Sequence, residues 1–225
     1  MARLKKHSLI RKYALLLALG IPLGAVAQTE AENVWALEIL SGTTASLPTP
    51  LRIRQLGEED IRLMAKYEMR PLAPPFYYVL RITKWKSNRA WELELIHLKL
   101  YLKNGPAEVQ FFAISHGYNH LSINWAQRRK GLVLRLGAGI VFAHPENKVR
   151  GKKLPENGGI FGLGQYLSGP GLQAAIGKEL YFWKSLSITA EGKITLSFAR
   201  IPIQDGRANM ANLTFHGIIG LRYSL

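Results

Sequence analysis

The sequence TFHGIIGLRYSL, residues 214–225, decides the fold expected for this chain. Side chains of an extended strand alternate between its two faces. One face of this stretch is apolar and carries Phe215, Gly217, Ile219, Leu221, Tyr223 and Leu225. The other face is mostly polar or small and carries Thr214, His216, Ile218, Gly220, Arg222 and Ser224. The pattern predicts a β-strand that ends the chain and has an apolar environment on one side only.

This stretch resembles the closing strand of bacterial outer-membrane β-barrels, with aromatic Tyr223 close to the end and an apolar last residue. Members of that class usually end in Phe, whereas this chain ends in Leu225. The resemblance implies an all-β fold, a closed antiparallel transmembrane β-barrel over residues 28–225, located in the bacterial outer membrane. It also implies that the strand Thr214–Leu225 is recognised by the barrel-assembly machinery.

Eight further segments have the composition of strands, which gives nine in all: 34–42, 61–70, 76–83, 91–100, 109–125, 132–142, 172–181, 186–199 and 214–225. Bacterial barrels have even strand numbers. Either 109–125 is two short strands hinged near Gly117 and Asn119, giving ten, or one early segment does not span, giving eight. A soluble sandwich or lipocalin-like barrel has the same alternation and remains the structural alternative.

The amino terminus has the features of a secretory signal peptide. Residues 1–13 contain five basic residues and no acidic residue, residues 13–23 are apolar, and Ala25-Val26-Ala27 forms a cleavage site. The apolar run is shorter than the roughly 20 residues that a membrane-spanning helix needs. We therefore expect export through the inner membrane, cleavage after Ala27 and a single mature domain, residues 28–225.

The charge of the chain bears on its partners. The formal net charge is +15, and loss of the five basic residues of the signal peptide leaves +10. A surface rich in anionic phosphate is the expected partner, namely outer-membrane lipid and lipopolysaccharide, and nucleic acid is not expected for an exported chain. The absence of cysteine excludes disulfides, thiolate nucleophiles and cysteine metal sites. The sequence predicts no cofactor and no metal.

The polar faces of the candidate strands carry charges of both signs in similar numbers. In a transmembrane barrel these side chains have to neutralise one another within a narrow lumen. The predicted lumen charge network consists of Glu38, Arg62, Lys66, Glu68, Arg81, Glu92, Glu94, Arg135, Glu191, Lys193, His216 and Arg222. Such a network is either a structural ionic core or the lining of a narrow solute path.

One short motif allows a catalytic hypothesis. His120 and Ser122 are two residues apart and share a strand face, and a hydroxyl beside an imidazole can act as nucleophile and base. The spacing resembles the motif of the outer-membrane lipid A deacylases, which implies His120 as base and Ser122 as nucleophile. Family members usually have Asn directly after the Ser, but here Ile123 intervenes. The alternative is a buried His and Ser hydrogen-bonded to their neighbours.

A basic loop is the last candidate site. Residues 144–153 include four cations that could contact the phosphates of lipopolysaccharide: Lys148, Arg150, Lys152 and Lys153. His144 and Glu146 in the same loop provide only two metal ligands, so a metal site is not expected. Three functions therefore remain open: a structural or lipopolysaccharide-interacting barrel, a lipid A ester hydrolase, and a narrow solute channel.

Overall fold

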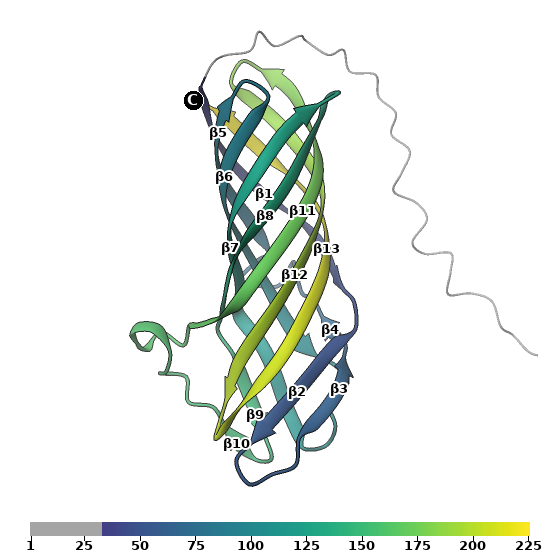
Figure 1. Ribbon diagram of the computed structural model, residues 1–225, viewed down its shortest axis with the longest axis vertical. Coiled ribbons are helices and arrows are strands. Elements are labelled where there is room, and N and C mark those ends of the chain that lie inside the picture. Colours follow the sequence, from purple (N-terminus) through teal and green to yellow (C-terminus); the bar gives the residue numbers. More distant parts are fainter. Residues whose placement is uncertain (1–32) are drawn as a thin grey trace, which may run out of the picture.

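The computed structural model describes residues 33–225, and the predicted signal peptide lies outside these residues. The chain forms one antiparallel sheet that closes into a ring (Figure 1). The strands of the ring, in order, are β1 (Val34–Ser46), β5 (Tyr78–Lys86), β6 (Arg89–Leu102), β7 (Val109–Arg129), β8 (Leu132–Ala143), β11 (Tyr166–Trp183), β12 (Leu186–Ile203) and β13 (Gly206–Ser224). The closed barrel is confirmed, and of the two predicted strand numbers eight is the correct one.

The terminal strand closes the ring. β13 pairs with β12 on one side and with β1 on the other, where the register runs from Ala36 opposite Ser224 to Ser46 opposite Thr214. The amide of Leu225 extends this ladder by a hydrogen bond of 2.8 Å to the carbonyl of Trp35. The ladder therefore continues to the last residue of the chain.

The two ends of the barrel differ in their connections. At the end that holds both Val34 and Ser224, here called the termini end, adjacent strands are joined by the two-residue turns 87–88, 130–131 and 184–185. At the opposite end, the loop end, the connections 47–77 and 144–165 are long. Outer-membrane barrels have short periplasmic turns and longer extracellular loops. The loop end is therefore the extracellular end.

A loop-end extension of short strands continues the barrel beyond this rim (Figure 1). It comprises β2 (Thr49–Gln55), β3 (Ile61–Ala65), β4 (Tyr67–Glu68), β9 (Glu146–Val149), β10 (Lys152–Lys153), the 3₁₀ helix η1 (Ile160–Gly162) and the residues that join them. β2 pairs with β13 and β3, and β9 pairs with β7. The early segment that does not span is thus 61–70, whereas β7 runs unbroken from Val109 to Arg129.

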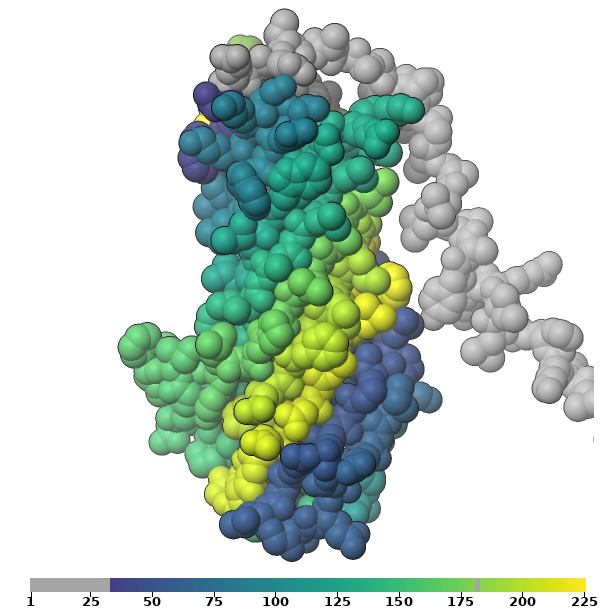
Figure 2. All heavy atoms as spheres, in the orientation of Figure 1, coloured from purple at the N-terminus to yellow at the C-terminus, as the bar shows by residue number. Residues whose placement is uncertain are grey.

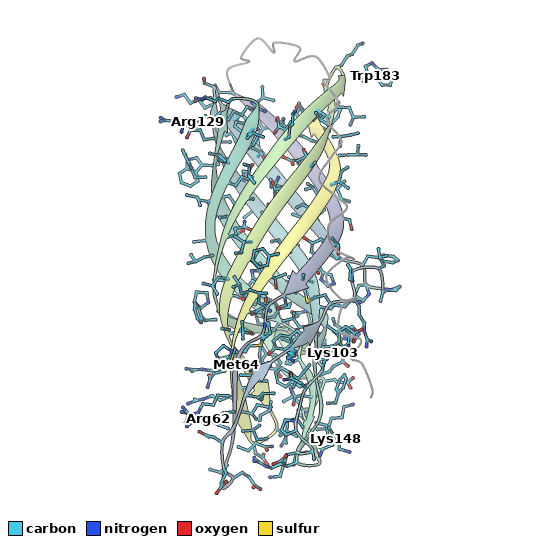
Figure 3. All side chains as sticks on the ribbon, turned by 90° about the vertical axis from the view of Figure 1, so that its right-hand side faces the viewer. Arg62, Met64, Lys103, Arg129, Lys148 and Trp183 are labelled. Atoms are coloured by element: carbon cyan, nitrogen blue, oxygen red, sulfur yellow. The ribbon has the colours of Figure 1, made fainter. Side chains whose placement is uncertain are left out.

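The barrel is apolar outside and polar inside. The outward side chains exposed by 40% or more include Trp35, Leu37, Ile39, Leu80, Ile82, Trp91, Leu93, Ile123, Leu136, Ile140, Leu172, Ile176, Phe198, Phe215, Ile219, Leu221 and Tyr223. Figure 3 shows Trp183 projecting from the barrel near the turns of the termini end. An aqueous protein buries such residues, so this belt matches a hydrocarbon environment. Within residues 33–225 no helix is long and apolar enough to cross a membrane.

The polarity inverts along β12 without any change of side-chain parity. From Leu186 to Phe198 the outward residues are apolar or small, and the inward residues are Ser187, Thr189, Glu191, Lys193, Thr195 and Ser197. Beyond Phe198 the outward residue is Arg200, which is exposed, and the inward residues are Ala199, Ile201 and Ile203, which are buried. The strand therefore passes from lipid to water between Phe198 and Arg200, because an outward arginine is costly in hydrocarbon and water drives the burial of the apolar inward residues.

The inversion corrects part of the predicted lumen network. Arg62 and Lys66 are exposed and Glu68 is half-buried, whereas their sequence neighbours Ile61 and Ala65 are buried. The expectation that these three charges face the lumen was wrong, because 61–70 lies in the loop-end extension and follows the rule for aqueous proteins. The extension and the loop-end half of the barrel share one apolar core, which includes Leu40, Leu51, Ile53, Val79, Ile96, Leu98, Leu100, Phe112, Ile114, Ile201 and Met210.

Candidate functional sites

The middle of the barrel contains an ionic core, defined as Glu38, Glu92, Glu94, Glu191, Arg81, Arg135, Lys193 and Arg222, all of them buried. Arg81 lies at its centre. Its Nη1 is 3.0 Å from Glu38 Oε2, its Nε 2.6 Å from Glu94 Oε2 and its Nη2 2.8 Å from Glu191 Oε1. One guanidinium from β5 therefore joins carboxylates from β1, β6 and β12.

A second guanidinium extends this connection around the barrel. Arg135 on β8 lies 3.0 Å from both carboxylate oxygens of Glu92, and its Nη1 is 2.8 Å from Glu191 Oε2. Lys193 donates a hydrogen bond to Glu94 and lies 3.4 Å from Glu191 Oε1. The core therefore pairs four carboxylates with four cations. Its charges neutralise one another and fill the interior, which in an eight-stranded barrel is only just wide enough for side chains.

The termini end of the lumen is closed by an aromatic side chain. Trp85 is 1% exposed, and the guanidinium of Arg128 lies over its ring at 3.7 Å from the centroid. Glu179 links Arg128, at 2.9 Å, to Arg222 of the ionic core, at 2.7 Å. This arrangement separates the ionic core from the periplasmic side.

A polar layer lies between the ionic core and the apolar core. His216 bridges two walls of the barrel, with Nδ1 2.9 Å from Tyr77 Oη and Nε2 3.0 Å from Thr195 Oγ1. Tyr118 Oη and Ser197 Oγ are 2.8 Å apart. The predicted lumen residue His216 is thus inside the barrel, where it is hydrogen-bonded to hydroxyls and has no ion pair among residues 33–225.

The structure places both predicted catalytic residues on β7 with their side chains inside the barrel. His120 is 4% exposed and Ser122 is 6% exposed. Ser122 Oγ accepts a hydrogen bond of 2.8 Å from Gln173 Nε2, and among the described residues His120 Nε2 has no hydrogen-bond partner. The two residues line a cavity of about 10 Å³, roughly the volume of one water molecule. An ester bond of a membrane lipid has no room there.

A serine, a histidine and a glutamate meet at the loop end: Ser115 and His116 on β7 and Glu146 on β9. Ser115 donates a hydrogen bond to Glu146 Oε1, and His116 Nδ1 lies 2.5 Å from the same oxygen. The His116 and His144 rings are 4.9 Å apart. Hydroxyl and carboxylate both approach Nδ1, so the imidazole does not lie between them as a general base must. Among residues 33–225 no group of three His, Asp or Glu side chains is positioned to hold a metal ion.

The four cations of the predicted lipopolysaccharide-contact loop lie on and beside the β9–β10 hairpin: Lys148, Arg150, Lys152 and Lys153. Figure 3 shows Lys148 in the lower part of the molecule, nearer the tip of the loop end than Met64. The ion-pair partners of the other three are Glu58 for Arg150 at 3.8 Å, Asp205 for Lys152 at 2.9 Å and Glu156 for Lys153 at 2.7 Å. The loop therefore presents less uncompensated charge than its sequence suggests.

The closed ring, apolar belt and ionic interior are those of a small bacterial outer-membrane β-barrel, and the chain is an integral outer-membrane protein of this kind. In such a barrel every backbone group is paired, which is what a bilayer requires.

No protein-family model matches the sequence, and no curated protein matches it either. Solved structures with a similar fold include the outer membrane protein OprG from Pseudomonas aeruginosa, which is 8% identical with a TM-score of 0.41 over 87% of this chain and 97% of that chain. The outer membrane protease OmpT from Escherichia coli is 11% identical with a TM-score of 0.39, over 89% and 99%. Ail, the attachment invasion locus protein of Yersinia pestis, in complex with the heparin analogue sucrose octasulfate, is 8% identical with a TM-score of 0.35, over 84% and 99%. Similarities of this size say nothing about function.

Proposed function

We propose that this protein is a closed, non-catalytic outer-membrane barrel that binds lipopolysaccharide at its loop end. The observation that carries the proposal is the filled interior, which leaves the outer surface of the molecule for binding. Side chains of the ionic core, the polar layer and the apolar core occupy successive levels of the barrel.

The charge of the loop end supports an anionic ligand. Over residues 47–77, 98–114, 144–165 and 200–209 there are thirteen Lys and Arg and eight Asp and Glu. The outer leaflet beside this end is rich in phosphorylated glycolipid, and phosphate is bound by charge-assisted hydrogen bonds from Arg and Lys.

The termini end is basic as well, and it provides an internal comparison. Among the residues that the structure describes, its cationic side chains are Lys84, Lys86, Arg89, Arg128, Arg129, Lys130, Lys178 and Lys184, and the acidic side chain among them is Glu179. These residues lie beside the periplasmic leaflet, where lipopolysaccharide is absent. Removing charge there changes the net charge of the molecule without changing the proposed binding surface.

Lipopolysaccharide retention by the folded protein tests this function. Purified mature protein is reconstituted in lipid nanodiscs, and bound lipopolysaccharide is measured by native mass spectrometry against phosphatase-treated lipopolysaccharide. We expect retention of the phosphorylated form that weakens as ionic strength rises. Equal retention of the two forms, or none, contradicts the proposal. The variant Lys86→Gln/Lys130→Gln, at the termini end, is expected to bind like the wild type.

The other two functions have no observation in their favour. A hydrolase requires a substrate bond at Ser122, which is enclosed within the barrel and hydrogen-bonded to Gln173. A channel requires an open path, whereas Trp85 and the ionic core occupy the lumen. We therefore expect no conductance in planar bilayers.

A further inference from the structure

Five arginines lie together on the outer surface where the barrel meets the loop-end extension. They come from four strands that lie side by side on one face of the molecule, β12, β13, β2 and β3 (Figures 1 and 2). We call them the arginine row: Arg52, Arg54, Arg62, Arg200 and Arg207. Apart from Arg62, none was singled out from the sequence, because the other four lie outside the segments predicted as strands.

The register of the sheet aligns these residues. Arg200 is opposite Asn209, Asn209 is opposite Arg52, and Arg52 is opposite Arg62. Three arginines therefore lie on a line across four strands, which spans roughly 14 Å because neighbouring strands are about 4.8 Å apart. A second line two residues further along places Arg207 opposite Arg54.

The row lies immediately beyond the lipid-facing belt. Phe198 precedes Arg200 by two residues on the outer face of β12 and is 56% exposed. Met64 follows Arg62 by two residues on the outer face of β3 and is 53% exposed. Figure 3 shows Met64 nearer the barrel and Arg62 nearer the loop end. Two residues of strand are about 7 Å long, so the guanidinium groups are at the level of the lipid headgroups.

One carboxylate organises three of the arginines. Asp60 Oδ2 accepts a hydrogen bond of 2.7 Å from Arg52 Nε and one of 3.3 Å from Arg62 Nη2, and it lies 3.7 Å from Arg54 Nε. A single negative charge cannot neutralise three positive ones. Asp60 therefore fixes the geometry of these side chains and leaves most of their charge available.

The other two arginines have no partner within residues 33–225: Arg200 and Arg207 make no hydrogen bond and no ion pair there. Asp205, two residues before Arg207, is bound to Lys152 at 2.9 Å. The arginine row and Asp60 together therefore carry five positive charges and one negative charge.

We propose that the arginine row binds the phosphate groups of lipopolysaccharide from the side, while the acyl chains of the same molecule lie on the apolar belt that begins at Phe198 and continues toward the termini end. The inference rests on the proposed function and names its site. Arg is suited to this role because its planar guanidinium binds phosphate through paired hydrogen bonds. A cationic surface next to an exposed apolar surface matches a ligand that has an anionic headgroup and apolar acyl chains.

The double variant Arg200→Gln/Arg207→Gln tests the site, because neither side chain holds another residue in place. Lipopolysaccharide affinity is measured by native mass spectrometry in nanodiscs for wild type and variant. We expect the variant to bind at least about tenfold more weakly, because it loses the charge-assisted hydrogen bonds of two guanidinium groups to phosphate. The heat-dependent shift of the folded protein in gel electrophoresis verifies that the variant barrel is closed.

The matched control is Lys148→Gln/Lys153→Gln, which removes the same charge from the β9–β10 hairpin at the same end of the molecule. It is expected to reduce affinity by less than the arginine variant. If both double variants lose affinity equally, the effect is one of net charge and the site is wrong. If the arginine variant binds as the wild type does while the wild type binds lipopolysaccharide, the site fails and the proposed function stands.

Two further ligands separate the sources of phosphate. Phosphatase-treated lipopolysaccharide is expected to bind wild type and arginine variant equally weakly. Vesicles containing phosphatidylglycerol should distinguish the two proteins far less than lipopolysaccharide does. An equal loss toward phosphatidylglycerol would show a general site for anionic lipid and overturn the assignment to lipopolysaccharide. A wild type that retains no lipopolysaccharide contradicts this inference and the proposed function together.

Discussion

Arg81 on β5 and Glu191 on β12, 110 residues apart in the sequence, form an ion pair inside the barrel with 2.8 Å between Nη2 and Oε1. Both side chains are fully buried, and Glu191 also accepts a hydrogen bond from Arg135 on β8. These side chains therefore connect β5, β8 and β12 across the interior, and no two of these strands are neighbours in the ring. This ion pair and the backbone hydrogen bonds between neighbouring strands together fix the cross-sectional shape of the barrel.

Arg81→Ala is expected to lower the free energy of unfolding by about 3–5 kcal/mol, because removing one partner leaves buried carboxylates uncompensated. Urea unfolding of the protein in lipid vesicles, followed by tryptophan fluorescence, measures this change. The control is Lys86→Ala on the same strand, which is exposed and should change stability by about 0.5 kcal/mol or less. Equal effects of the two substitutions would show that the ionic core contributes nothing specific.

Gly139→Ala is expected to destabilise the barrel by about 1–3 kcal/mol, because it overpacks a tight contact. A Cβ at Gly139 would lie 2.0 Å from the carbonyl oxygen of Leu121 on the neighbouring strand. Gly192→Ala is the matched control, since a Cβ there meets nothing within 4 Å. The same unfolding measurement should place Gly192→Ala within about 1 kcal/mol of the wild type, and a reversed order would contradict the packing described.

Ile123→Arg is expected to cost about 2–4 kcal/mol, because it places a charge in the hydrocarbon layer. Ile123 is 60% exposed on the outer face of β7 and lies opposite Leu93 and Ala138 in the adjacent strands. Leu56→Arg changes an even more exposed residue, at 85%, but in the loop-end extension, where water solvates the charge. If both variants unfold at the same urea concentration, the belt does not face lipid.

Ser122→Ala is expected to leave the acylation of lipid A unchanged. The hydroxyl is enclosed within the barrel and accepts a hydrogen bond from Gln173. Mass spectrometry of lipid A from cells that express the wild type, the variant or neither protein makes the comparison. A loss of one acyl chain that requires Ser122 would restore the hydrolase hypothesis.

The loop around His144 is expected to loosen as the pH falls. Burial of His144, together with the neighbouring His116, holds the pKa of His144 below its ordinary value. The folded loop therefore binds a proton less readily than the unfolded chain, so its stability is complete above pH of about 6.5 and declines below it. The protection factors of residues 144–154, which are the intrinsic exchange rates divided by the observed rates at the same pH, should fall between pH 7 and pH 5, roughly the range where histidine titrates. The fall should be smaller in His144→Gln, and an equal fall in both proteins would assign the effect elsewhere.

Much of the barrel could be predicted from the sequence. The alternation of residues 214–225, 132–142 and 186–199 gave the correct faces, because strand parity is local and independent of the partner strand. Eight of the twelve predicted lumen charges form the ionic core, among them Glu38, Arg81 and Glu191. Because the apolar face of each strand contacts lipid, the charged residues on the opposite face have to point into the lumen.

The loop-end extension could not be predicted in the same way. Alternation at 61–70 is as regular as in any membrane strand, but its apolar face is turned inward. Period-two alternation does not specify which side is wet, so Arg62 was misplaced. The arginine row depends on the pairing of β2 with β13, a contact between residues more than 150 apart in the sequence. A signal was present in β12, where the inward positions change from polar to apolar after Phe198 and the next outward residue is Arg200.

The inversion of polarity has a consequence for biogenesis. The loop end, with thirteen basic residues over 47–77, 98–114, 144–165 and 200–209, has to cross the hydrocarbon layer to reach the cell surface, while β13, the strand that completes the ring, is made last. A charged surface of this size cannot cross unaided at any useful rate. We therefore expect spontaneous refolding into intact bilayers to be slow and to accelerate in thinned or defect-rich membranes, so that delivery of the extension rather than pairing of the strands limits maturation.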